Sequence, residues 1–149
     1  MQSLFDPGGR QSVLGRLEQL QSGAPRQWGK MNAAQMLAHC SIAMEMATGE
    51  KPRKQKLIGK LLGPFVRSSL LGDKPFGKNS PTDRAFIVTE EKDFEAEKQR
   101  LARLVNNFCE SGPEKASAGM HSFLGRLEGE EWGVMMYKHL DHHLRQFGV

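Results

Sequence analysis

The segment from Trp132 to Gln146 constrains the fold most strongly, because its apolar residues repeat with the period of an α-helix. At about 100° per residue, two histidines, His139 and His143, fall on the inward stripe of this helix. Residues four apart on a helix have Cβ atoms about 6 Å apart, a separation at which two imidazoles can bind one metal ion. The other members of the stripe are Met135, Met136 and Gln146.

A single histidine on an apolar face is usually a hydrogen-bonded core residue, and this interpretation stands beside the metal hypothesis. Two such rings are harder to bury, since each buried polar atom without a hydrogen bond lowers the stability of the fold by about 1–3 kcal/mol. A shared metal ion would satisfy one nitrogen of each ring. An isolated H-x-x-x-H pattern is nevertheless common, so the hypothesis requires a third ligand.

A second helical segment supplies that third ligand. Asn32 and Gln35 have the spacing of a capping box, and Gly49 stands where a helix would end. His39 falls on the inward stripe of this helix. Three histidines from two helices predict a site with an open coordination position, typical of catalytic zinc. We therefore expect a divalent ion, zinc or nickel, bound by His39, His139 and His143.

Acidic side chains on the two ligand helices are predicted to face away from the site. Ser41 and Glu45 lie off the inward stripe of the second helix, and Lys138, Asp141 and Arg145 lie on the outer half of the last one. No carboxylate is therefore placed by spacing beside the ion as a general base.

Helical periodicity marks four long elements. The first is a short helix containing Val13 and Leu17 that ends before Gly23, and the third runs from after Thr89 to about Glu110, where Ser111-Gly112-Pro113 stops it. The strand-like run from Ala85 to Val88 is too short to build a sheet. The fold class predicted is all-α: an antiparallel four-helix bundle, formed by one domain of residues 1–149.

Residues 51–78, between the second and third helices, contain eight Lys and Arg against one Asp, a net charge of +7, although the whole chain carries only +4. Their apolar positions predict an extra amphipathic helix, interrupted near Pro64. A solvated polar face over the bundle is one interpretation, and an anion site for an acidic substrate is another. Attachment to nucleic acid or to a membrane surface is disfavoured, because no aromatic residues interleave with the charges.

Composition predicts a globular cytoplasmic protein, with a hydrophobic content of 38% and no apolar run of the roughly 18 residues that a transmembrane helix needs. Cys40 and Cys109 lie among apolar residues, which favours reduced core thiols over a disulfide. The expected partner is a small-molecule substrate. No nucleic acid is expected, and a homodimer is left open.

The C-terminal run HLDHHLRQFG resembles the H-x-x-x-H-x-x-Q ending of the DinB-like, or YfiT-like, superfamily of metal-dependent enzymes, and WGKMNAAQMLAHC is similar to the ligand segment of its second helix. The segment that begins at His121 is similar to a less characterised branch, although Ser122 replaces its usual proline. The resemblance implies a four-helix bundle, with metal ligands at His39, His139 and His143. It also implies chemistry on low-molecular-weight thiols.

Three functions follow as hypotheses. A metal-dependent small-thiol S-transferase is favoured, because a coordinated thiol is deprotonated without a protein base. A metal-dependent hydrolase is the first alternative, and a non-enzymatic binding module that uses residues 51–78 is the second. His121 is a candidate substrate contact or fourth ligand, against a hydrogen bond within its own loop, and His142 is expected at the boundary of the inward stripe.

Overall fold

Capping residues in the sequence set where two central helices begin. In helix α2 (Ala33–Ala47), the Asn32 side chain accepts a hydrogen bond from the Gln35 backbone N–H, and the Gln35 side chain accepts one from the Asn32 N–H. In helix α4 (Phe94–Ala116), the Asp93 carboxylate accepts a hydrogen bond from the Ala96 N–H at 2.7 Å. The capping box predicted for α2 is confirmed.

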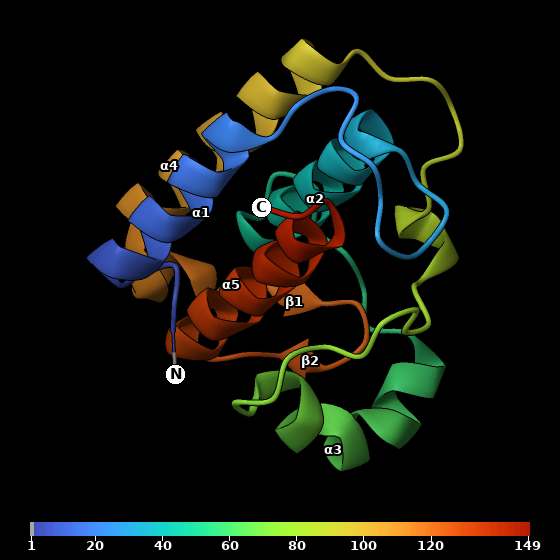
Figure 1. Cartoon of the computed structure of the whole chain (residues 1–149). Coiled ribbons are helices and arrows are strands. Elements are labelled where there is room, and N and C mark those ends of the chain that lie inside the picture. Colours follow the sequence, from blue (N-terminus) through green and yellow to red (C-terminus); the bar gives the residue numbers. More distant parts are fainter. Residues whose placement is uncertain (1) are drawn as a thin grey trace.

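The computed structural model describes residues 2–149, and within them the chain is mostly helical (Figure 1). The remaining helices are α1 (Pro7–Gln19), α3 (Leu57–Leu71) and α5 (Gly129–Gln146). A 3-10 turn, η1 (Arg84–Phe86), lies between α3 and α4, and a small hairpin of β1 (Met120–His121) and β2 (Gly125–Arg126) lies between α4 and α5. The prediction of a predominantly helical chain is confirmed. The finer prediction of an antiparallel four-helix bundle is not confirmed.

Helix α2 lies between α4 and α5 and packs on both, while α1 packs on α4 and α5 (Figure 1). This central position explains why nearly all of α2 is buried, including its alanines and methionines. Helix α3 lies at the edge of the molecule, against α5 and the hairpin. The core is therefore formed by α1, α2, α4 and α5.

The predicted end of the third long helix coincides with a break, but α4 continues beyond it to Ala116. Gly112 has a φ of 75°, a left-handed conformation that breaks α4, and one further turn follows from Pro113. Pro64 lies inside α3 and does not interrupt it, in contrast to the expectation. The strand-like run from Ala85 to Val88 includes the turn η1 instead of a strand.

Four polar side chains that were predicted to face away from the core are buried. Ser41 and Glu45 are covered because α4 packs on the second face of α2. Asp141 lies against Arg16 of α1, and Lys138 donates hydrogen bonds to backbone carbonyls at the end of α3. The prediction failed because a helical wheel ranks the faces of one helix and does not count how many neighbours cover them.

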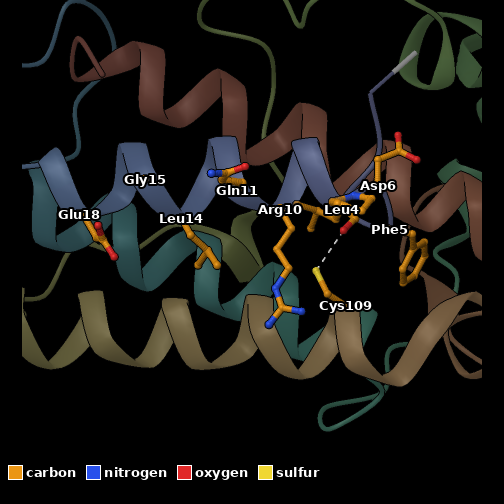
Figure 2. A pocket seen from close by; sticks show the side chains of 10 residues that line it. Leu4, Phe5, Asp6, Arg10, Gln11, Leu14, Gly15, Glu18 and Cys109 are labelled. Carbon is orange, nitrogen blue, oxygen red and sulfur yellow. Dashed lines mark hydrogen bonds between the residues drawn. The ribbon is translucent and has the colours of Figure 1, made fainter.

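A hollow of about 570 Å³ lies beside α1, and no histidine is among its lining residues (Figure 2). Arg10, Leu14 and Cys109 are among its lining residues, and the Cys109 thiol donates to the Leu4 carbonyl oxygen at 3.1 Å. Both cysteines are unbridged, as predicted, and burial raises the pKa of the Cys40 thiol strongly. Burial also raises the pKa of the Cys109 thiol, so neither cysteine offers an activated thiolate.

None of the helices described in residues 2–149 combines the length and the apolar character that crossing a membrane would require.

Candidate metal site

The three histidines predicted as ligands come together in the structure. His39 on α2 and the pair His139 and His143 on α5 have their ring centroids 4.6–5.0 Å apart. One nitrogen from each ring lies within 4.8 Å of the corresponding nitrogens of the other two. His39 and His143 are buried, and His139 is partly exposed. Three imidazoles at this spacing could hold a single metal ion.

The ring of His39 is oriented by the backbone of η1. Its Nδ1 lies 2.7 Å from the Phe86 carbonyl oxygen, and because a carbonyl can only accept, Nδ1 carries the proton. In the neutral ring this leaves a lone pair on Nε2. The Nε2 atom faces the other two histidines, lying 3.0 Å from Nε2 of His139. A metal-binding histidine typically has this arrangement of one held and one available nitrogen.

The ring of His143 is held in the same way by a side-chain relay. Its Nδ1 lies 2.9 Å from Oε1 of Gln146, and Nε2 of Gln146 donates to the Trp28 carbonyl oxygen at 2.7 Å. The second bond fixes the orientation of the amide, since only its nitrogen can donate. Nδ1 of His143 therefore donates to Gln146, and its Nε2 keeps a lone pair.

His139 has no such partner. Its Nδ1 atom is buried and has no hydrogen-bond partner within the part of the chain that the structure describes. Its Nε2 atom lies 3.0 Å from the Nε2 of His39, which already carries a lone pair. A hydrogen bond between the two rings would leave Nδ1 of His139 as a buried, unsatisfied acceptor, at a cost of about 1–3 kcal/mol. The donor set is therefore incomplete as a purely hydrogen-bonded cluster.

Electrostatics keep these rings neutral. Burial lowers the pKa of His143 to about 3, with a further contribution from the nearby His39. Burial lowers the pKa of His39, and the pKa of His139 is lowered well below its ordinary value by burial and by the other histidines. At neutral pH all three rings therefore present lone pairs, which is the form that binds metal ions.

The two buried acidic side chains on the ligand helices are engaged elsewhere. Glu45 pairs with Arg100 and Lys51, and Asp141 pairs with Arg16 and Arg145. No carboxylate belongs to the metal-ligating group found among residues 2–149. Both acids are buried, in contrast to the outward orientation that was predicted for them.

The remaining histidines border the site. Nδ1 of His121 accepts hydrogen bonds from the backbone N–H groups of Phe123 at 3.1 Å and Leu124 at 3.0 Å, so its proton lies on Nε2. This bond within the hairpin is the alternative that was weighed against a ligand role, and His121 is not one of the three clustered residues. His142 is partly buried beside the rings of Trp28, Phe76 and His143.

Sequence reasoning missed the groups that orient the ligands. The Phe86 and Trp28 carbonyl oxygens are backbone atoms, for which no residue type gives a signal. Gln146 was placed correctly on the inward face one turn after His143, which is the only sequence signal for this part of the site.

No curated protein and no solved structure matches this chain. One family matches residues 8–148, and its description is "Protein of unknown function (DUF1569)". The resemblance to the DinB-like superfamily was wrong, since nothing links the matched family to it. An H-x-x-x-H-x-x-Q ending follows from helix geometry and from the chemistry of imidazole ligands, so unrelated helical proteins can share it. Because the match spans nearly the whole sequence, the chain belongs to the DUF1569 family.

Proposed function

We propose that His39, His139 and His143 bind one divalent metal ion, zinc or nickel, and that the protein uses it as a metal-dependent enzyme. The observation that carries the proposal is the convergence of three neutral rings, two of which have Nδ1 held by an acceptor. The unpartnered Nδ1 of His139 supports it, because hydrogen bonds among the three neutral rings cannot satisfy every buried ring nitrogen. A three-imidazole set leaves the charge of the ion uncompensated and a coordination position open.

The reaction that we propose is transfer of a small thiol to an electrophilic substrate. When bound, a divalent ion supplies Lewis acidity and lowers the pKa of a coordinated thiol or water. Glu45 and Asp141 are occupied by arginine and lysine partners, so neither of them is free to act as a general base for hydrolysis. Thiol transfer does not require one, which is why it is favoured over hydrolysis.

In this proposal the chain's own residues position the reactants. The thiol sulfur forms a bond to the electrophilic carbon, the leaving group departs with its electron pair, and the thiol proton passes to water. His139 is the partly exposed member of the three, so we expect substrate to approach at its side. His121, whose Nε2 carries the proton, is the candidate hydrogen-bond donor to the substrate.

Elemental analysis of untagged protein tests the metal site. The wild type is expected to contain or take up one equivalent of zinc or nickel, and saturating metal should raise its melting temperature. His139→Ala should lose most of the bound metal. His142→Ala is the matched control, because His142 neighbours the cluster without belonging to it. A folded wild type that binds neither metal would refute the site.

A thiol panel tests the reaction separately. Metal-loaded wild type, His143→Ala and His142→Ala would be assayed with each thiol and monobromobimane as a generic electrophile. Wild type and His142→Ala should consume thiol faster than His143→Ala. Equal rates for all three proteins with every thiol would exclude the transferase while leaving metal binding intact, and activated esters would then test the hydrolase.

A further inference from the structure

Helix α3 exposes its apolar face and buries the face that carries its glycines. Leu57, Leu61 and Phe65 are 82%, 70% and 80% exposed, and Ile58 and Leu62 beside them are 58% and 42% exposed. Gly59 and Gly63 are buried on the opposite side of the helix. The apolar residues 57, 58, 61, 62 and 65, hereafter the α3 apolar face, thus form one continuous outward stripe.

The helix is held in this orientation by contacts along its inner side. A Cβ added to Gly59 would lie 2.2 Å from the Phe123 carbonyl oxygen, so helix and hairpin are in close contact there. The Lys138 ammonium donates to the Leu70 carbonyl oxygen at 2.8 Å, and Arg67 pairs with Glu131. Turning the α3 apolar face inward would break these contacts. Its exposure is therefore built into the way the helix docks.

The segment that contains α3 is rich in positive charge. Residues 51–78 carry a net charge of +7, and Asp73 is their only acid. Lys54, Lys60 and Lys74 are exposed, and none of them takes part in an ion pair among residues 2–149. An apolar stripe with lysines near it is the pattern of a helix that lies in the plane of a membrane interface. The sequence alone disfavoured this attachment, and the exposure of Phe65 on the stripe is the observation that favours it. The lysine stems can extend beside the apolar residues toward lipid phosphates.

We propose that α3 attaches the protein to an anionic lipid surface, with the α3 apolar face inserted at the headgroup level and the exposed Lys54, Lys60 and Lys74 contacting lipid phosphates. Fifteen residues give a helix of about 22 Å, which is shorter than the roughly 30 Å hydrocarbon core, so the helix lies on the bilayer. This attachment does not depend on the metal site. It would bring the histidine cluster close to membrane-associated substrates.

The charge near the α3 apolar face favours a lipid surface over a second copy of the chain or a nucleic acid as the binding partner. A dimer with α3 packed on α3 would bring together the exposed Lys54, Lys60 and Lys74 of both copies, which is unfavourable at low salt. Nucleic acid would satisfy the lysines but would leave five large apolar side chains in water. An anionic bilayer satisfies both features of the surface.

Co-sedimentation with vesicles tests the proposal. The full chain should bind vesicles of phosphatidylcholine with phosphatidylserine, and binding to phosphatidylcholine alone should be at least about tenfold weaker. Leu61→Glu with Phe65→Glu should weaken binding to the anionic vesicles at least about tenfold. Ile87→Glu is the matched control, since Ile87 is 52% exposed outside α3 and its change should alter binding less than about twofold.

A second pair of variants separates charge from apolar insertion. Lys54→Glu with Lys60→Glu should weaken vesicle binding and its salt dependence, whereas Arg103→Glu on the exposed side of α4 should not. In Phe65→Trp, the added tryptophan emission should shift to the blue and be quenched by brominated lipids. Absence of binding at low salt, or equal binding to neutral vesicles, would overturn the proposal. A wild-type dimer dissociated by Leu61→Glu with Phe65→Glu would assign the face to self-association instead.

Discussion

The ring of His143 and the amide of Gln146 form a relay one helical turn long, in which Nδ1 of His143 donates to Oε1 of Gln146 at 2.9 Å. The same amide donates to the Trp28 carbonyl oxygen at 2.7 Å and so connects the last turn of α5 to the loop before α2. The relay presents Nε2 of His143 toward His39 and His139. Outer groups of this kind set ring orientation and ligand basicity in metal sites.

Gln146→Ala is therefore expected to weaken metal affinity by about 10–100-fold without removing a ligand. Gln146→Glu keeps an acceptor for the His143 N–H and should retain much more of the affinity. Competition titration with a chromophoric chelator gives both dissociation constants. Equal affinities for wild type and Gln146→Ala would show that the relay has no part in metal binding.

His121 should make the metal-free protein less stable in acid. Burial lowers its pKa from 6.5 to about 4, so between these values the unfolded chain binds a proton that the folded chain does not. The free energy of unfolding should therefore fall as the pH decreases from 6.5 to 4, by at most about 3 kcal/mol from this residue.

His121→Asn isolates this contribution, because an asparagine oxygen can still accept from the Phe123 and Leu124 N–H groups but does not titrate. Urea unfolding at pH 7.5 and pH 4.5 would measure it. The variant should lose less stability between the two pH values than the wild type. Parallel pH profiles would contradict the prediction.

Glu45 is expected to matter for stability and not for activity. Burial acts to raise the pKa of this carboxyl, but hydrogen bonds from Arg100 and Lys51 outweigh it and lower the pKa. Glu45→Gln should therefore lower the free energy of unfolding by about 1–3 kcal/mol near neutral pH. Metal content and thiol consumption per folded molecule should be unchanged. A selective loss of activity in the folded variant would instead identify Glu45 as a base.

Substitutions at two glycines of α3, four residues apart, are expected to loosen the helix to different extents. In Gly59→Ala the new Cβ would meet the Phe123 carbonyl oxygen at 2.2 Å, whereas in Gly63→Ala the same oxygen is 3.3 Å away. Gly59→Ala should therefore detach α3 more than Gly63→Ala, despite the better helix propensity of alanine.

Hydrogen exchange over residues 57–71 would report the loosening of α3. Gly15→Ala in α1 is the control, because no atom lies within 4 Å of its added Cβ, and it should stabilise the protein by about 0.5–1 kcal/mol. Equal exchange in the two α3 variants would show that the contact with Phe123 does not hold the helix.

The sequence determined those features that depend on one helix at a time. Helix period and capping located α2 at Asn32 and Gln35, and the i, i+4 spacing placed His139 and His143 on one face. The prediction that His39 joins them is consistent with their proximity in the structure. The shared face of His139 and His143 follows because side-chain direction on a helix depends on residue number alone, whereas the approach of His39 also required α2 to pack on α5.

Only the tertiary structure decided which atoms surround those side chains. The Phe86 and Trp28 carbonyl oxygens orient two ligand rings, although their segments lie 47 and more than 100 residues away along the chain. Glu45 was predicted to be exposed and is buried, because α4 covers a second face of α2.

Helix α3 is a second case in which the sequence could not predict burial, because here apolar side chains are exposed. Its amphipathic pattern correctly predicted a helix, but the pattern could not tell which face would dock. The close approach of Gly59 to the hairpin turned the apolar residues outward. Periodicity fixes the faces of a helix, whereas the choice of the face that is buried depends on the packing energies of every element around it.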